Sequence, residues 1–336
     1  MRFVIMSLGS IGQRHLRNLR TLLPDAEIAV WRRPGPADRP CPAGADALLE
    51  SLEAVLAFTP DAAIVASPAS AHLAAALALA DSGTHLLVEK PLATSPAGVV
   101  DLVRRCRERN LVLMTGYNLR FMPSLRKARQ LIDEGVIGTV IGARAEVGQY
   151  LPDWRPATDY RQGVSARGEL GGGALLELSH DIDYLLWILG RPGKVTARGG
   201  KFSDLDIDVE DVAEILLDYE QPRRLVNLHL DMVQRSPIRR CRFIGTEGVL
   251  DWDCIADRIE YFQSLTNQWQ QIEDLRLEDR NTMYIDELRH FIDCVRTRRS
   301  PECSGEDGLA VLRVVEAARA SMSRSETLTL DVGEGE

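Results

Sequence analysis

The sequence has few cysteines, and they lack the spacings that usually carry function. Six cysteines are spread over 336 residues, and no two form the C-x-x-C pair of a zinc ribbon or a redox dithiol. Scattered thiols are typical of a reducing compartment. The chain also lacks an apolar run of membrane-spanning length and a signal-peptide cleavage pattern. We therefore expect a cytoplasmic protein without a membrane partner.

Basic residues are in deficit. The chain carries 40 Lys and Arg against 49 Asp and Glu, a net charge of −9, which makes it a poor candidate for binding nucleic acid or an anionic membrane surface. Hydrophobic residues make up 45% and charged residues 26%, as in ordinary globular proteins. A single core rarely holds 336 residues, so we expect two domains, over residues 1–120 and 121–336.

The first third of the chain alternates short apolar runs with helical patterns. The expected strands are Arg2–Leu8, Glu27–Trp31, Ala62–Ala66, His85–Val88 and Leu111–Thr115, and the expected helices are Ile11–Leu23, Asp46–Ala57 with Asp46 as N-cap, Ala69–Ser82 and Pro96–Arg109. Apolar runs of this kind are typical of parallel strands that are buried on both faces. The fold class is therefore α/β, with an N-terminal Rossmann domain built on a doubly wound parallel sheet.

Past residue 120 the apolar residues no longer form continuous runs but alternate with polar residues. The expected strands are Val140–Tyr150, Val195–Phe202, Asp211–Tyr219, Arg224–Val233, Arg239–Phe243, Val249–Trp252 and Leu328–Val332, and the expected helices are Pro123–Glu134, Ala174–Leu189, Met283–Arg296 and Gly305–Ser323. Successive period-two segments indicate strands with one covered and one free face. We therefore expect a C-terminal α+β domain with a large, mostly antiparallel open sheet.

A glycine-containing turn follows the first strand. Residues 7–12, Ser-Leu-Gly-Ser-Ile-Gly, are similar to the G-x-G-x-x-G fingerprint, whose glycines let backbone N–H groups approach a pyrophosphate at a helix N-terminus. Ser7 replaces the first glycine, so an ordinary strand-to-helix turn is the alternative. The position within a βαβ unit at the start of the chain favours a dinucleotide site.

Two arginines, Arg32 and Arg33, follow the second strand. At this position NAD enzymes place an acidic residue that binds the ribose 2′-hydroxyl. Arginine cannot accept that hydrogen bond, whereas it pairs well with a 2′-phosphate. The pair therefore favours NADP(H), with NAD(H) and a merely solvated basic pair as the alternatives.

Two more segments follow strands at the edge where a doubly wound sheet places its site. Ser67, Pro68 and His72 come after one strand, and Glu89-Lys90-Pro91 follows the next. A lysine there could hold a substrate oxygen or relay its proton. From the bare sequence, a surface lysine beside a turn proline is the favoured alternative.

A second cluster opens on three glycines, Gly171 to Gly173. Glu177, His180 and Asp183 then recur every three residues, so we expect them to share one face of a helix. His180 could exchange a proton near neutral pH, with a carboxylate one turn away to fix its tautomer. A mixed polar helix face is the alternative. No further His or Cys joins the cluster, so we expect no metal.

Together these motifs resemble the glucose–fructose oxidoreductase, inositol dehydrogenase and rhizopine-catabolism (Gfo/Idh/MocA) family. The resemblance rests on GSIGQRH, SPASAH, EKP, GYNLRF and GGGALLELSHDID, which occur in this order at Gly9–His15, Ser67–His72, Glu89–Pro91, Gly116–Phe121 and Gly171–Asp183. EKP after a strand, followed by a glycine-rich helix that contains H-x-x-D, is specific in combination. Many members place Asp four residues before the histidine; Leu176 stands there, and Glu177 lies three residues before it.

The resemblance implies an NAD(P)-dependent dehydrogenase that acts on sugars, cyclitols or nucleotide-linked sugars. It implies a homodimer or homotetramer formed through the C-terminal sheet. The expected catalytic residues are Lys90, His180 and Glu177. The expected cofactor contacts are Gly9, Ser10, Ile11, Gly12, His15, Arg32, Arg33, Ser67, Pro68, His72, Glu89 and Lys90. The expected substrate contacts are Lys90, Arg120, Trp154, Tyr160, Arg161 and His180.

Two other functions fit the same fold. One is redox-neutral glycosidic cleavage or epimerisation, in which the cofactor is recycled. The other is a non-catalytic protein that senses cofactor or sugar, since fold does not fix function. The presence of both Lys90 and His180 favours an enzyme.

Overall fold

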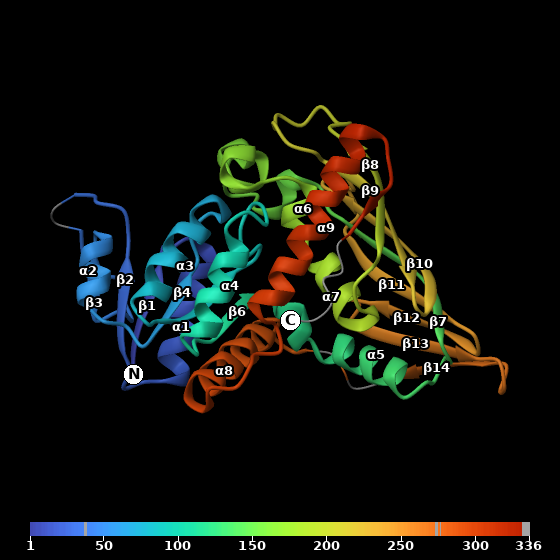
Figure 1. The fold of residues 1–336 in the computed structure, drawn as a ribbon, viewed down its shortest axis with the longest axis horizontal. Coiled ribbons are helices and arrows are strands. Elements are labelled where there is room, and N and C mark those ends of the chain that lie inside the picture. Colours follow the sequence, from blue (N-terminus) through green and yellow to red (C-terminus); the bar gives the residue numbers. More distant parts are fainter. Residues whose placement is uncertain (37–38, 273–274, 276, 331–336) are drawn as a thin grey trace. The chain divides into compact units, whose positions relative to one another are not determined.

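The computed structural model describes residues 1–36, 39–272, 275 and 277–330 and places them in two compact units (Figure 1). The first unit comprises residues 1–118 and 280–309, and the second comprises residues 119–279 and 310–336 as far as they are described. Residues 280–309 therefore return to the first unit, whereas the sequence-based division assigned everything after residue 120 to the second domain. No helix within the described ranges is both long and apolar enough to cross a membrane.

The first unit is built on a six-stranded parallel sheet. The strand order is β3-β2-β1-β4-β5-β6, which confirms the doubly wound fold. Its strands are β1 (Arg2–Met6), β2 (Glu27–Trp31), β3 (Ala47–Leu49), β4 (Ala62–Val65), β5 (His85–Glu89) and β6 (Leu113–Gly116). Every residue of β4 and β5 is buried, as expected for central strands covered on both faces.

Helices cover this sheet, as Figure 1 shows. They are α1 (Ser10–Leu22), α2 (Leu52–Ala57), α3 (His72–Asp81), α4 (Val99–Glu108), α8 (Asn281–Thr297) and the first residues of α9 (Gly305–Arg324). Helix α8 packs on α1, so the returning segment completes the first unit. Because parallel strands end at one edge, the residues after β1, β2, β4 and β5 all lie at the carboxyl edge of the sheet.

One expected helix start is wrong. The Asp46 carboxylate does not cap a helix; it accepts hydrogen bonds from the backbone N–H of Ile28 at 2.7 Å and from Arg20 at 2.6 Å. The residues that follow form β3, which extends the sheet beside β2. Helix α2 begins later and is capped by Ser51, whose hydroxyl accepts from Ala54 N–H at 3.1 Å. The backbone N–H and C=O groups of β3 are satisfied by pairing with β2 instead of by hydrogen bonds within a longer helix.

The second unit is built on a nine-stranded sheet in the order β14-β13-β12-β11-β7-β10-β9-β8-β15. Among the described residues of this sheet, β7 and β10 pair in parallel and the other neighbouring strands pair antiparallel. The strands are β7 (Val140–Gly148), β8 (Lys194–Gly200), β9 (Val212–Glu220), β10 (Arg223–Asp231), β11 (Ile238–Gly245), β12 (Gly248–Asp253), β13 (Arg258–Gln263), β14 (Gln268–Ile272) and β15 (Leu328–Thr329). The expected mostly antiparallel sheet is confirmed.

Helices α5 (Pro123–Asp133), α6 (Ala174–Glu177) and α7 (His180–Leu189) pack on this sheet (Figure 1). The expected single helix over Ala174–Leu189 is therefore two helices, interrupted at residues 178–179. Strands β13 and β14 were not expected. The residues of β14 are mostly exposed on both faces and show no alternation of apolar and polar side chains. The expected last strand is shorter than Leu328–Val332, and residues 331–332 lie outside the described residues.

Candidate active site

The phosphate loop after β1 has the backbone geometry that a dinucleotide fingerprint requires. A Cβ added to Gly12 would lie 2.2 Å from the Ser7 carbonyl oxygen, whereas one added to Gly9 would meet nothing within 4 Å. Helix α1 begins at Ser10, and no side chain caps its N-terminus. The first N–H groups of α1, including that of Ile11, are therefore available to an anion.

Ser7 occupies the position of the missing first glycine and keeps the backbone shape of that glycine. Its φ is +88°, in the left-handed region that side chains usually avoid. Its N–H donates to the Trp31 carbonyl at 2.9 Å, which joins the ends of β1 and β2. The sequence departure thus changes the side chain at this turn but leaves the tight turn in place.

Arg32 and Arg33 follow β2 at the same sheet edge. The backbone N–H of Arg32 donates a hydrogen bond to the Leu49 carbonyl at 3.0 Å, so the backbone of Arg32 is held at the end of β3. Arg32 is half-buried and Arg33 is exposed. Residues 31–36, Trp-Arg-Arg-Pro-Gly-Pro, contain no carboxylate to accept a ribose hydroxyl.

His72 links the two loops that follow β4 and β5. Its Nε2 lies 2.7 Å from the Ser67 carbonyl, and its Nδ1 lies 2.8 Å from the Pro91 carbonyl. Burial lowers the pKa of His72, although both carbonyls act in the opposite direction. The two contacts bring Ser67, Pro68 and the Glu89–Pro91 segment together, as the sequence pattern predicted for adjacent strand ends.

Glu89, the last residue of β5, is buried and contacts His15 of α1. The distance from His15 Nε2 to Glu89 Oε1 is 2.6 Å, and Glu89 Oε2 accepts from the Lys90 backbone N–H at 3.2 Å. Lys90 itself is half-buried. The expected cofactor-side residues His15, Glu89 and Lys90 therefore form one connected group.

In the second unit, the glycines before α6 serve the backbone. Gly171 and Gly173 have φ values of +89° and +104°, which glycine adopts without steric cost. A Cβ on Gly172 would lie 2.4 Å from the Val164 carbonyl, and one on Gly173 would lie 2.4 Å from Glu210. This packing accounts for the glycine run without any ligand.

The three polar residues expected on one helix face lie on two helices. Glu177 ends α6, and its Oε2 accepts from the Ser165 hydroxyl at 2.9 Å. His180 begins α7. The Asp183 carboxylate lies against Arg120, at 2.6 and 2.9 Å. The Arg120 guanidinium is itself buried and is a charge partner of Asp183, since a buried charge requires an opposite charge. That a carboxylate orients His180 stays a prediction.

Arg120 was expected to contact substrate, and this stays a prediction. It is 2% exposed and paired with Asp183. The other expected substrate contacts lie on short helical turns of the segment 151–162. Trp154 Nε1 donates to the Gln149 carbonyl at 3.0 Å, Tyr160 Oη accepts from Asp206 N–H at 3.2 Å, and Arg161 pairs with Asp159 at 2.8 Å.

Two features of the structure have no counterpart among the residues expected from the sequence. Glu287 of α8 is fully buried and lies close to His15 and Glu89. An open surface pocket of about 500 Å³ beside Gly172 is lined by Gly168, Gly172, Gly200, Lys201, Asp208, Val209, Glu210 and Arg319. Their positions in the sequence carry no shared spacing, so only the folded chain brings them together.

Comparison with known proteins identifies the family. Residues 1–117 match the oxidoreductase family with an NAD-binding Rossmann fold, and residues 125–251 match the Gfo/Idh/MocA C-terminal domain. The chain belongs to the Gfo/Idh/MocA oxidoreductase family.

Individual relatives agree with this assignment. The chain is 26% identical to myo-inositol 2-dehydrogenase of Thermotoga maritima, over 98% of this chain and 99% of that one. It is 30% identical to 2,7-anhydro-N-acetylneuraminate hydratase of Mediterraneibacter gnavus, over 67% of this chain and 60% of the relative. Its fold matches WlbA dehydrogenase of Bordetella pertussis, solved with NADH and UDP-GlcNAcA, with a TM-score of 0.84 at 22% identity, covering 99% and 98% of the two chains.

Proposed function

We propose that this Gfo/Idh/MocA oxidoreductase transfers a hydride between a nicotinamide cofactor and a hydroxyl or keto carbon of a sugar, a cyclitol or a nucleotide-linked sugar. The observation that carries the proposal is the connected group at the carboxyl edge of the first sheet. This group consists of the turn that contains Gly9 and Gly12, the two loops linked by His72, and the Glu89–Lys90 pair. It lies at the edge where a doubly wound fold binds its ligand.

The residues of the first unit fit a dinucleotide. The open space at Gly9 and the uncapped N-terminus of α1 suit a pyrophosphate, and residues of the loops after β4 and β5 would line the nicotinamide side. When bound, the cofactor supplies or accepts the hydride. Arg32 and Arg33 support a preference for NADP(H), since both can pair with a 2′-phosphate.

His180 and Lys90 divide the proton chemistry in this proposal. His180 takes the proton of the substrate hydroxyl during oxidation and returns it during reduction. Lys90 stabilises the negative charge that develops on the same oxygen. Glu177 is proposed to support the loop that contains Ser165, to which it is hydrogen-bonded. Trp154, Tyr160 and Arg161 are proposed to contact the sugar.

A redox-neutral reaction is the second candidate. The relative named as a 2,7-anhydro-N-acetylneuraminate hydratase favours it, because a hydratase leaves its substrate with no net oxidation. The same residues would serve both reactions. A non-catalytic sensor would not need Lys90 and His180.

The free face of the second sheet supports an oligomer. Its exposed side chains carry both charges, as in the pairs Arg242–Asp251 and Arg240–Glu146, and a groove of about 540 Å³ crosses it. A face that carries both charges can pair with a second copy of itself across a twofold axis. We propose a homodimer or homotetramer through this face, which native mass spectrometry would test. The six free thiols support a cytoplasmic location.

The decisive experiment combines an absorbance assay with His180→Ala. Purified protein is mixed with NAD(P)+ and a panel of sugars and cyclitols, and products are identified alongside absorbance. Net reduction of the cofactor supports the dehydrogenase, whereas product without net reduction supports the redox-neutral candidate. His180→Ala should lower turnover about 100-fold or more. Retention of more than roughly a tenth of wild-type turnover would overturn the role of His180.

A further inference from the structure

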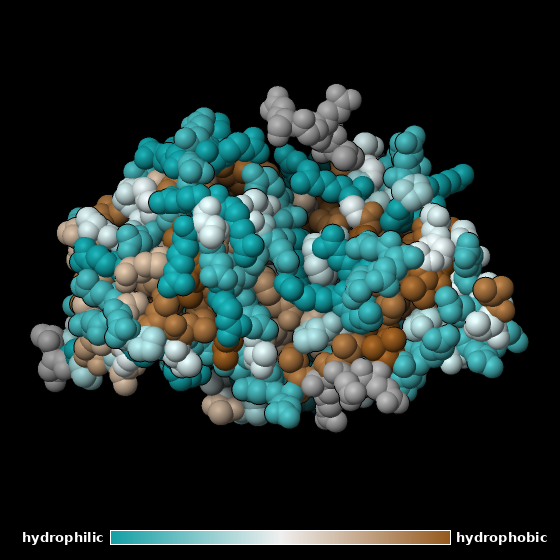
Figure 2. Space-filling model, turned by 90° about the horizontal axis from the view of Figure 1, so that it is seen from below, coloured by the Kyte–Doolittle hydropathy of each residue, from teal (hydrophilic) through white to brown (hydrophobic). Residues whose placement is uncertain are grey.

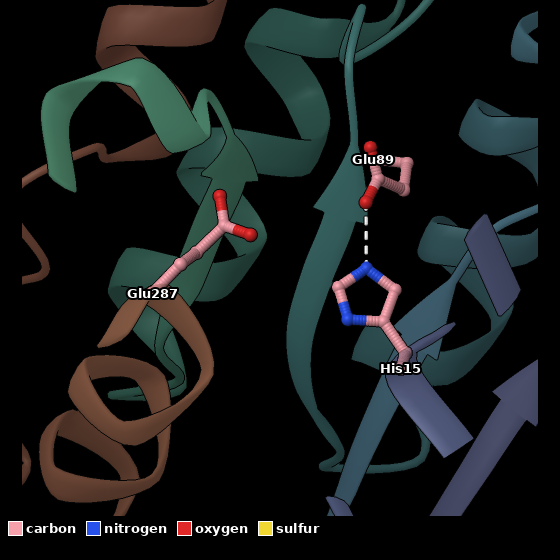
Figure 3. A group of neighbouring side chains, drawn as sticks. All are labelled: His15, Glu89 and Glu287. Atoms are coloured by element: carbon pink, nitrogen blue, oxygen red, sulfur yellow. Dashed lines mark hydrogen bonds and ion pairs between the residues drawn. The ribbon is translucent and has the colours of Figure 1, made fainter. Parts of the chain in front are cut away.

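Three ionisable side chains meet in the interior of the first unit. His15 comes from α1, Glu89 from the end of β5 and Glu287 from α8, and a ligand atom from each lies within 4.8 Å of the others. Figure 3 shows the His15 ring and the Glu287 carboxyl group both directed toward Glu89. His15 and Glu287 are 0% exposed, and Glu89 is 8% exposed.

Glu89 is held as a carboxylate. Burial alone would raise its pKa, but the hydrogen bond and charge of His15, the charge of Lys90 and the Lys90 backbone N–H together hold the pKa of Glu89 below its usual value. Its two oxygens are used in different directions, one toward His15 and one toward the backbone of Lys90. Gly116 on the neighbouring strand leaves room for this carboxylate, since a Cβ there would lie 3.1 Å from Oε2.

Glu287 is in the opposite situation. Neither of its carboxyl oxygens has a hydrogen-bond partner within the described parts of the chain. Burial, followed by the charge of Glu89, raises the pKa of Glu287 well above its usual value. The other ionisable groups around the cluster are Lys90 beside Glu89 and Tyr284 on α8, and Arg14 of α1 stacks on the Tyr284 ring at 4.2 Å. After burial and Glu89, Glu287 also raises the pKa of Tyr284, whereas burial and Glu89 are the causes that act on Glu287 itself.

A metal ion is the first alternative for two glutamates and a histidine. Zinc bonds of about 2.0–2.1 Å in a tetrahedral site would hold two ligand atoms about 3.4 Å apart. His15 Nε2 and Glu89 Oε1 are 2.6 Å apart, the length of a charge-assisted hydrogen bond. This separation suits a proton between the two atoms and is too short for a shared metal ion.

We propose that His15, Glu89 and Glu287 form a buried proton-sharing network, in which Glu287 is a neutral carboxylic acid beside the Glu89 carboxylate, and that this network positions Lys90. A neutral Glu287 can lie beside Glu89 without like-charge repulsion. The structure places ligand atoms of the two residues within 4.8 Å but without a hydrogen bond between them, and the proposal is that the protonated Glu287 carboxyl group turns toward Glu89 and donates to it. Glu89 then keeps its second oxygen on the Lys90 backbone. The positioning part rests on the proposed role of Lys90; the protonation part does not.

Two substitutions of Glu287 separate these statements. Glu287→Gln keeps the shape and a neutral donor, so kcat/KM should stay within about threefold of wild type. Glu287→Leu removes the donor, so kcat/KM should fall about tenfold or more, because small displacements of a catalytic group are costly. If Glu287→Gln fell as far as Glu287→Leu, the neutral-acid assignment would be wrong.

Infrared difference spectra test the proton directly. At neutral pH, wild type minus Glu287→Gln should show a carboxylic acid C=O band, whereas the exposed control Glu108→Gln should show only carboxylate bands. Absence of the carboxylic acid band overturns the proposal. Elemental analysis of the purified holoprotein provides a second check. A stoichiometric metal that is present in the wild type and lost in Glu287→Gln would show that the cluster binds a metal ion, and it would overturn the proposal.

An activity-independent measurement tests the positioning of Lys90. Lysines are reductively methylated with ¹³C, and the Lys90 resonance is assigned through Lys90→Arg. Glu287→Leu should shift this resonance, and Glu287→Gln should leave it in place. An unchanged Lys90 resonance in Glu287→Leu would disprove the positioning role even where the infrared band is present. Because this readout needs no turnover, it keeps its meaning if no tested sugar is a substrate.

Discussion

The Arg120 guanidinium donates two hydrogen bonds to the Asp183 carboxylate, and both side chains are buried. The pair joins the turn after β6 to helix α7, which begins at His180. Neither charge can be hydrated in place, so each depends on the other. The pair therefore stabilises the position of α7.

Asp183→Asn should destabilise the protein by about 3–5 kcal/mol, because it removes one charge of a buried, hydrogen-bonded ion pair. The double variant Arg120→Met with Asp183→Leu should recover most of that loss. The half-exposed pair Arg242–Asp251 is the matched control, and Asp251→Asn should cost less than about 1 kcal/mol. Urea unfolding measures all three; equal losses for Asp183→Asn and Asp251→Asn would contradict the assignment.

Local sequence patterns predicted the helices and strands whose apolar residues follow directly from which faces are buried. The run Ala62–Ala66 was correctly expected as a strand because a strand covered on both faces must be apolar throughout. The N-cap prediction for Asp46 was wrong, because its carboxylate accepts hydrogen bonds from Ile28 of the neighbouring strand and from Arg20. Strand β14 was missed because its side chains are mostly exposed and carry no hydrophobic period.

For the site, the sequence predicted residues that follow strands but not their partners. Parallel strands end at one edge, so the proximity of Ser67, His72 and Pro91 could be expected from their order alone. The partners of Asp183 and Glu89 come from elements distant in sequence, and no spacing rule connects them. Glu287 was overlooked for the same reason, since a glutamate in an amphipathic helix ordinarily faces water.

Ser7 holds a left-handed backbone conformation at the turn before α1. Ser7→Gly should raise stability by about 1 kcal/mol, because glycine avoids the steric cost of that conformation. Ser7→Ala is the matched control, since alanine bears the same cost and should bring no gain. Thermal unfolding without cofactor distinguishes them, and an equal rise in the two variants would show that the hydroxyl, not the backbone, is unfavourable.

Arg32 and Arg33 should determine the cofactor preference. NADP(H) should stabilise wild-type protein against heat more than NAD(H) does, because ligand that binds the native state raises its stability. Replacing both arginines with alanine should abolish this difference while leaving stabilisation by NAD(H) unchanged. The double variant Arg104→Ala with Arg107→Ala, which removes two exposed arginines on α4, controls for net charge. Equal wild-type stabilisation by both cofactors would remove the case for an NADP(H) preference.

His229 on the free face of the second sheet should make stability depend on pH. Hydrogen bonds to Asp231 and Glu214, at 3.0 and 2.6 Å, raise the pKa of His229 from 6.5 to about 9. Because the folded pKa exceeds the unfolded one, the stabilisation is complete below pH 6.5 and is lost as pH rises through about 9. We expect a contribution of about 1 kcal/mol, since Glu214 is half exposed and the pair is partly screened.

His229→Gln should flatten this part of the pH profile, because glutamine keeps hydrogen-bonding capacity but does not titrate. The measurement is the urea midpoint of wild type and variant at a series of pH values across this window, at constant ionic strength. The two profiles should differ most at the acidic end and converge at the alkaline end. Profiles that run parallel throughout would mean that His229 carries no charge in the folded protein.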